Sequence, residues 1–334
     1  MLPMPVFQAG FRLIDGSALN QMATAIQNAV VWPGNFIYLD PKNGSDANTG
    51  ATPTGAFQTL GQAFTLARAG KNDVIVLISD GTTASTVRLS ATFAWNKNAV
   101  HMIGICAPSF DSQRARISHP TTQTTNITPL IALSSNDCIF MNFSIFQGVG
   151  QASTDEQLID ITGQRNYFYN VSFQGMGHAN GAARSGSYII AFKNLGSENL
   201  FEHCSIGLET IARSAANASV VIPTGVLVER NMFRGCEFAM LPSSATALYL
   251  NIAAGTMNSS TMTFDRCNFK ALIGVGGGTQ PAVVATVTAA ANGNVYFNDC
   301  KTEAAKWALT NAQVYVNSGA TVSASAGGIA VTAP

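Results

Sequence analysis

The chain has 334 residues, 18 acidic and 18 basic side chains, and a charged fraction of 11%, well below the usual value of about 25%. A net charge of zero, without a run of Lys or Arg, excludes the electrostatic footprint of a nucleic-acid-binding protein. The absence of 18 consecutive apolar residues excludes a membrane-spanning helix. Low charge in a soluble chain indicates a surface that other protein largely covers.

Residues 1–35 are predicted to form an N-terminal arm. An extended apolar segment leads to Ser17, a suitable helix N-cap, and residues 18–29 then place apolar side chains on one helical face. This helix either caps the chain's own fold or inserts into a partner. No basic and apolar leader is recognisable, so we expect synthesis in a cytoplasm. The candidate anchor residues are Phe7, Phe11, Leu13, Ile14, Leu19, Met22 and Ile26.

The next segment alternates strand and helix signals. We expect a strand at residues 36–40, a turn-rich loop at 41–50, a helix at 57–69 and a strand at 74–78. Four side chains of the loop, Asp40, Asn43, Asp46 and Asn48, have a spacing that suits calcium, but the terminal Glu of an EF-hand is missing. An Asx-rich turn is the favoured interpretation.

The second half of the chain repeats one phrase, in which Phe is followed two residues later by a bend residue. Successive copies are 28, 33, 32, 31 and 33 residues apart, and a fixed period predicts stacked units that bury each other's apolar faces. Each unit should supply about three strands, with long loops such as 148–156 and 175–186 gathered at one edge. The copies begin at Phe140, Phe168, Phe201, Phe233, Phe264 and Phe297, and further strands are expected at 130–133, 158–161, 188–192, 226–228, 248–252, 282–287, 314–316 and 320–324.

Residues at equal places in the repeat predict columns along the stack. The Phe side chains should point inward, and Cys204, Cys236, Cys267 and Cys300 should form a buried column of free thiols. Asparagines two residues before the Phe, at 166, 199 and 231, should hydrogen-bond to one another along the axis.

The slot after the Phe should point outward. It holds Tyr169, Glu202, Arg234, Asp265 and Asn298, and the alternating charges resemble a catalytic cluster but are read as a surface ladder. Paired carboxylates for glycoside hydrolysis stay conceivable. Scattered histidines and the lack of a Cys-x-x-Cys pair give no support for a metal site, and no cofactor is expected.

Residues 38–60 hold a motif that is typical of a known family. It reads Tyr-Leu-Asp-Pro-x-Asn-Gly-Ser-Asp-x-Asn-x-Gly at 38–50 and is followed by Ala-Phe-x-Thr-Leu at 56–60. This pattern resembles the start of single-stranded right-handed parallel β-helices of the pectate-lyase-like superfamily. The resemblance implies an all-β solenoid over residues 36–334, with the arm and short helices capping its start. Such folds include polysaccharide-cleaving enzymes, surface proteins and phage tail spikes, so fold alone leaves function open.

A shorter resemblance suggests an assembly role. Residues 7–20 resemble the start of tailed-phage virion structural proteins, which implies a bacteriophage capsid decoration (cement) protein. The expected protein is a homotrimer in the virion whose arms bind the major capsid protein. A tail spike or fibre that binds a host surface glycan is the second hypothesis, and a polysaccharide lyase or hydrolase is the third.

Overall fold

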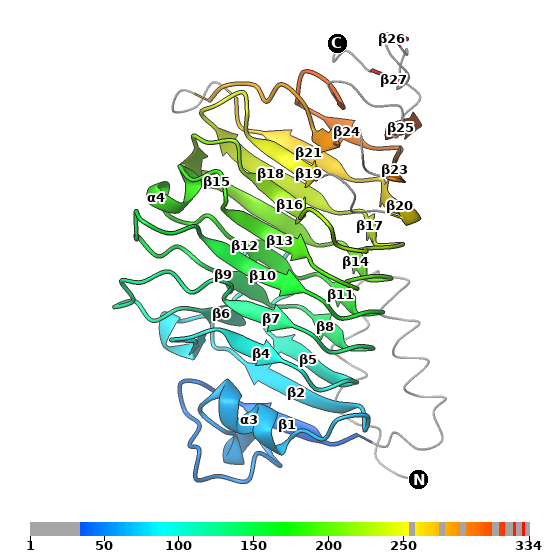
Figure 1. Ribbon diagram of the computed structural model, residues 1–334. Coiled ribbons are helices and arrows are strands. Elements are labelled where there is room, and N and C mark those ends of the chain that lie inside the picture. Colours follow the sequence, from blue (N-terminus) through cyan, green and yellow to red (C-terminus); the bar gives the residue numbers. More distant parts are fainter. Residues whose placement is uncertain are drawn as a thin grey trace.

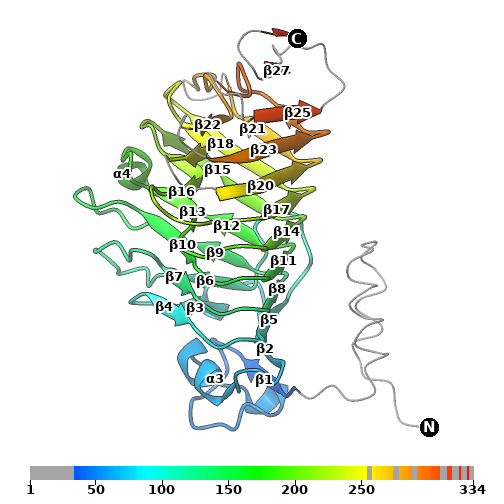
Figure 2. The same cartoon turned by 45° about the vertical axis from the view of Figure 1, so that its right-hand side comes forward.

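The computed structural model describes residues 34–253, 258–273, 278–287, 292–308, 314–317, 323–324 and 329–330. Within these ranges the chain winds into a coil of about seven turns, and each turn contributes strands to three long parallel sheets (Figure 1). The predicted all-β parallel β-helix is therefore confirmed. The coil is elongated, and the segment with α3 (Leu60–Leu66) lies beside β1 at its N-terminal end (Figure 2).

The three sheets run side by side along the coil axis, and all of their strand pairs are parallel. Sheet A contains β1 (Phe36–Leu39), β2 (Asp73–Ile78), β5 (Val100–Ile105), β8 (Ile139–Met141), β11 (Tyr167–Tyr169), β14 (Leu200–Glu202), β17 (Met232–Arg234), β20 (Asn258–Asp265), β23 (Asn292–Asn298) and β25 (Val314–Asn317). Sheet B contains β3 (Thr86–Arg88), β6 (Arg116–Ser118), β9 (Ser144–Phe146), β12 (Ser172–Gln174), β15 (Ser205–Arg213), β18 (Glu237–Pro242), β21 (Asn268–Ala271) and β24 (Lys301–Thr302). Sheet C contains β4 (Phe93–Trp95), β7 (Ile131–Leu133), β10 (Gln157–Ile161), β13 (Tyr188–Phe192), β16 (Ala218–Ile222), β19 (Leu248–Ile252) and β22 (Ala285–Val287).

The remaining described elements are short. They are α4 (Ala179–Ala182), the 3-10 turns η1 (Pro53–Gly55) and η2 (Thr83–Ser85), and the antiparallel pair β26 (Ser323–Ala324) and β27 (Ile329–Ala330). The helix α3 is shorter than the predicted 57–69 at both ends, because Phe57 pairs with Leu39 as a β-bridge and the backbone is extended at Ala67. Thr59 caps α3 by accepting a hydrogen bond from the Gln62 N–H, and Asp46 in turn accepts from the Thr59 hydroxyl.

The core is a stack of aromatic rings inside the coil. Neighbouring rings of the repeated Phe lie 4.5 to 5.0 Å apart at their centroids and are nearly parallel. The spacing follows from the distance between neighbouring strands of a sheet, about 4.8 Å. The predicted inward column of Phe is confirmed, and so is the column of buried free cysteines.

Bend residues with left-handed backbone close the corner between sheets A and B. Asn142, Asn170, His203, Gly235, Arg266 and Asp299 all have φ between 49° and 59°. Each donates its backbone N–H to a carbonyl of the following turn, as Asn142 does to Tyr169 and His203 does to Arg234. The strained backbone is held because the corner continues the hydrogen-bond ladder of the sheets.

One predicted strand is wrong. Residues 226–228 form a loop, and the third strand of that turn is β16 at Ala218–Ile222. The prediction failed because Val228 is buried in the core although it lies in a loop, so its apolar segment resembles a strand. The other strands of the repeat lie within three residues of their expected starts.

Candidate functional site

The outward face of sheet A changes character along the axis. In its N-terminal turns the outward residues are apolar apart from the buried His101, which lies on β5 between Val74 and Ile139. The apolar residues are Tyr38, Val74, Val76, Ile103, Ile139, Met141, Tyr167 and Tyr169. In the following turns one outward column becomes charged, with Glu202 on β14, Arg234 on β17 and Asp265 on β20. The predicted outward slot is thus confirmed, and it brings acidic, basic and phenolic groups together on one face.

The charged residues contact one another across neighbouring strands. Tyr167 donates its hydroxyl to Glu202 Oε2 at 2.7 Å. Arg234 Nη1 lies 3.8 Å from Glu202 Oε1, and its Nε lies 3.5 Å from Asp265 Oδ2 without hydrogen-bond geometry. Burial, followed by the hydrogen bond to Glu202, raises the pKa of Tyr167 well above its usual range.

This cluster has limited catalytic potential. Glycoside hydrolysis needs two carboxyl groups with a sugar or water between them. Here Arg234 lies on β17, between the strands that carry Glu202 and Asp265, and its guanidinium is close to both carboxylates. The sequence did not predict that Tyr167 belongs to this cluster, because Tyr167 precedes the repeated Phe168 whereas the predicted outward slot follows it. Its hydroxyl is hydrogen-bonded to Glu202. Glu202 itself is only 8% exposed, so the predicted surface ladder is partly buried.

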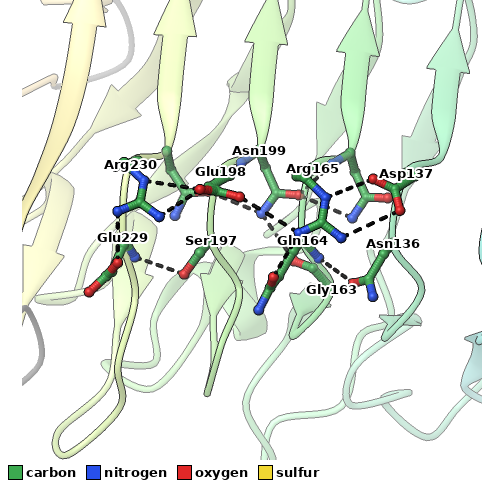
Figure 3. A network of polar contacts seen from close by, with 12 residues as sticks. Asn136, Asp137, Gly163, Gln164, Arg165, Ser197, Glu198, Asn199, Glu229 and Arg230 are labelled. Carbon is green, nitrogen blue, oxygen red and sulfur yellow. Dashed lines mark hydrogen bonds and ion pairs between the residues drawn. The ribbon is translucent and has the colours of Figure 1, made fainter.

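A second charged ladder lies at the corner between sheets C and A (Figure 3). Arg165 Nε contacts Asp137 Oδ1 at 2.8 Å and Arg230 Nη2 contacts Glu198 Oε1 at 2.6 Å, while Arg165 and Glu198 are 3.7 Å apart. Glu229 pairs with Arg230 at 3.0 Å. All four corner residues from Asp137 to Arg230 have positive φ, between 52° and 60°, and their side chains alternate in sign from turn to turn.

A buried asparagine column supports this corner. Asn199 Oδ1 accepts from the backbone N–H and from Nδ2 of Asn166, each at 3.0 Å, and Asn199 donates in the same way to Asn231 Oδ1. All three asparagines are 1% exposed. The predicted amide ladder is confirmed. The charged ladder beside it was missed, although the sequence holds a signal: Arg165, Glu198 and Arg230 each come directly before one of these asparagines.

Two long loops form a separate polar region at the other edge. Loop 147–156 and loop 175–187, which includes α4, are joined by Arg184 to Asp155 at 2.9 Å and by Asn180 to the Gly150 carbonyl at 2.6 Å. The prediction that such loops build one surface is confirmed. Beneath them, Glu156 is fully buried, and its Oε1 accepts from the Gly177 N–H at 2.9 Å.

The described residues give no metal site. No group of three or more His, Cys, Asp or Glu within them could hold a metal ion. Asp40 accepts hydrogen bonds from the backbone of Lys42 and Asn43, and Asp46 accepts from Gln58 and Thr59, which confirms the Asx-rich turn. A small void inside the coil, between Trp95 and Phe168, is lined by hydrophobic side chains alone. None of the described helices is long and apolar enough to span a membrane.

The candidate anchor residues lie outside the described residues. Phe7, Phe11, Leu13, Ile14, Leu19, Met22 and Ile26 all precede Gly34, where the described chain begins. Their role as partner-binding residues therefore stays a prediction.

Comparisons with known proteins concern the fold. No protein-family model and no curated protein sequence matches the chain. A solved pectin methylesterase from Aspergillus niger is similar with a TM-score of 0.53 and 14% identity, covering 90% of this chain and 91% of that one. The pectin methylesterase PemA from Erwinia chrysanthemi matches at a TM-score of 0.46 and 13% identity, covering 84% and 80%. A pectate lyase matches at 0.47 and 12%, covering 86% and 71%.

The chain is a right-handed parallel β-helix of the pectate-lyase-like type. At 14% identity the likeness to the Aspergillus enzyme covers the fold and does not extend to its activity.

Proposed function

We propose that the chain is a structural protein of a tailed-phage virion, most simply a capsid decoration protein. In this proposal the β-helix is a rigid shaft, and the N-terminal arm, residues 1–35, attaches it to the major capsid protein. Three copies would assemble as a homotrimer. The protein would be made in the host cytoplasm and would act in the virion.

The observation that carries the proposal is the way in which charged side chains are used. Along both ladders each one contacts a neighbour one turn away: Arg165 lies between Asp137 and Glu198, and Arg234 lies between Glu202 and Asp265. Groups paired along the axis tie successive turns together, whereas a catalytic site also needs a space beside such groups in which a reacting atom can sit. The arrangement suits a shaft. The resemblance of residues 7–20 to virion structural proteins supports a role in a virion.

The anchor is tested in the full chain by co-sedimentation with capsids that lack the protein. Exchange of Phe7, Phe11 and Leu13 for serine should abolish co-sedimentation, because the apolar contacts of the arm are lost. A control with Gln8→Ser and Asn20→Ser should bind as the wild type does. Binding retained by the triple variant would refute the anchor. Sedimentation equilibrium tests the trimer, which should have three times the chain mass of 35.0 kDa.

A second candidate function is supported by one specific observation. Glu202, Arg234 and Asp265 share the outward face of sheet A, and carboxylates beside a guanidinium are suited to hydrogen bonds with sugar hydroxyls. On this alternative the chain is a tail spike or fibre that binds a host surface glycan, or a polysaccharide lyase or hydrolase like the enzymes that share its fold.

Glycan arrays and product assays separate these alternatives. Receptor binding would give selective retention of a glycan that Glu202→Gln weakens and the corner variant Glu198→Gln leaves unchanged. A spike would also copurify with tails rather than heads. An enzyme would release reducing ends or unsaturated products from host capsule or lipopolysaccharide. No retention and no product over a broad panel would exclude both.

A further inference from the structure

A strip of apolar side chains lies on the outside of the coil, at the N-terminal end of sheet A. It is formed by Val74, Val76, Ile103, Met141 and Tyr169, and Tyr38, Ile139 and Tyr167 pack against them. The side chains come from five neighbouring strands: β1, β2, β5, β8 and β11. The strip ends where Glu202 makes the outward face polar.

The strip is buried although it faces outward. The five central side chains are between 2% and 7% exposed. Their hydrophobic neighbours within the described ranges all belong to the same face of sheet A, so these neighbours pack beside the strip and not over it. A single sheet layer leaves one face of its outward side chains open. These exposures are those of a single chain, so the cover must come from another part of the same chain.

The loop between β5 and β6 is not positioned to supply this cover. Its Gln113 donates to Asn170 at the corner between sheets A and B, and its Asp111 accepts from Ser172 and Ser205 on sheet B. These contacts carry the loop along the corner and onto the neighbouring sheet. The side of the strip away from this corner receives no polar contact from the loop.

The last residue of the N-terminal arm, Asn35, lies at the edge of the strip. Asn35 donates its N–H to Asp73 Oδ1 at 2.7 Å and accepts from the Val74 N–H at 2.8 Å, so the chain enters the fold against β2. Residues 16–33, just before this point, contain no charged side chain. A helix without charges is poorly suited to lie fully exposed in water.

The predicted helix also has the right length. Residues 18–29 would span roughly 18 Å as an α-helix, at 1.5 Å per residue. The strip crosses five strands, and four steps of about 4.8 Å give roughly 19 Å. The apolar face of the helix, with Leu19, Met22 and Ile26, would thus reach from one end of the strip to the other.

We propose that residues 17–29 pack across the apolar strip of their own chain, with Leu19, Met22 and Ile26 facing Val76, Ile103 and Met141. The arm then has two parts: a helix held on sheet A, and an extended segment with Phe7, Phe11, Leu13 and Ile14 that stays available to a partner. The contact between helix and strip is a property of the isolated protein and does not depend on the proposed capsid anchor.

Oxidation of methionines by hydrogen peroxide, followed by mass spectrometry, tests the contact in the full chain. Met141 points outward into the strip, and Met102 on the neighbouring strand is fully buried and points into the core. In the wild type both should react slowly. Exchange of Leu19, Met22 and Ile26 for serine should raise the oxidation rate of Met141 by about tenfold or more, because local opening no longer has to break the contact. Met102 should stay protected.

A matched control exchanges Asn20, Thr24 and Gln27, on the opposite helical face, for serine and should leave Met141 protected. The proposal is overturned if the apolar variant leaves Met141 protected, or if Met141 reacts rapidly in the wild type. Protection that disappears on dilution would assign the cover to a second copy and contradict a contact within one chain. A rise in Met102 oxidation equal to that of Met141 would make the helix a folding element of the coil, which also contradicts the proposal. Loss of capsid binding with Met141 still protected would concern the anchor alone.

Discussion

The carboxyl group of Glu156 is fully buried beneath loop 175–187. Its Oε1 accepts from Gly177, but its Oε2, which faces Gly181, has no hydrogen-bond partner among the described residues. Burial is the main cause that raises the pKa of Glu156 to about 8, and backbone N–H groups of residues 176–178 oppose it. The folded protein therefore holds the proton at pH values where the unfolded chain has released it.

Glu156 should make stability fall as pH rises. Because its pKa is higher in the folded state, its contribution is complete below about pH 4.5 and is lost progressively up to about pH 8. The loss should be on the order of a few kcal/mol. Urea unfolding of the wild type and of Glu156→Gln at pH 5 and pH 8 measures it. The variant should lose less stability over this range, and an equal loss in both proteins would show that Glu156 does not titrate as described.

Phe233 is one of the two central rings of the core stack. It lies 4.5 Å from Phe201 and 5.0 Å from Phe264 and is completely buried. Exchange for alanine should lower the free energy of unfolding by about 3–5 kcal/mol, because it removes the ring and leaves a cavity between two neighbours that the sheets hold apart. Denaturant unfolding measures the change, with Leu227→Ala in an exposed loop as a control. A cost near that of the control would contradict the stacked core.

At the scale of elements, the corner between sheets C and A separates buried from exposed polar contacts. Asn199→Ala removes four hydrogen bonds to Asn166, Gly163 and Asn231 from a buried site, and should cost about 2–4 kcal/mol. Its neighbour Glu198 makes ion pairs with Arg230 and Arg165, but in solvent, so Glu198→Ala should leave stability nearly unchanged. Thermal unfolding compares the two variants, and equal losses would contradict this division.

The elements also show what sequence can predict. A repeat with a constant period determines which residues become neighbours along the axis, so the Phe, Cys and Asn columns could be predicted from spacing alone. The strand at 226–228 could not, because only residues 214–217 join β15 to β16, so the third strand ends at Ile222 and a loop follows it. The period of the repeat does not say how its residues are divided between strands and loops. Apolar loop residues such as Val228 also reach the core. The hydroxyl of Tyr167 and the buried Glu156 depend on loop and face geometry that no spacing encodes.

In the whole molecule, the outward face of sheet A holds both the charged cluster and the apolar strip. The outward side of sheet A is mostly apolar near the N-terminus, and one of its columns is charged farther along. The strands of the coil stack turn upon turn along one axis (Figure 1). The fold is predictable because each turn places the same kinds of side chain at the same positions of the core. The use of its surface is less predictable, since it depends on the arm and on partners that the repeat does not specify.

Electron microscopy of purified virions is the sharpest test of the proposal that the coil is a shaft attached through its arm to a phage capsid. We expect rod-shaped density on the capsid shell into which the β-helix fits, with the β1 end toward the major capsid protein. The same particles carrying Phe7→Ser, Phe11→Ser and Leu13→Ser in this chain should lack that density. Density confined to the tail, or bound to the shell through the opposite end of the coil, would contradict the claim.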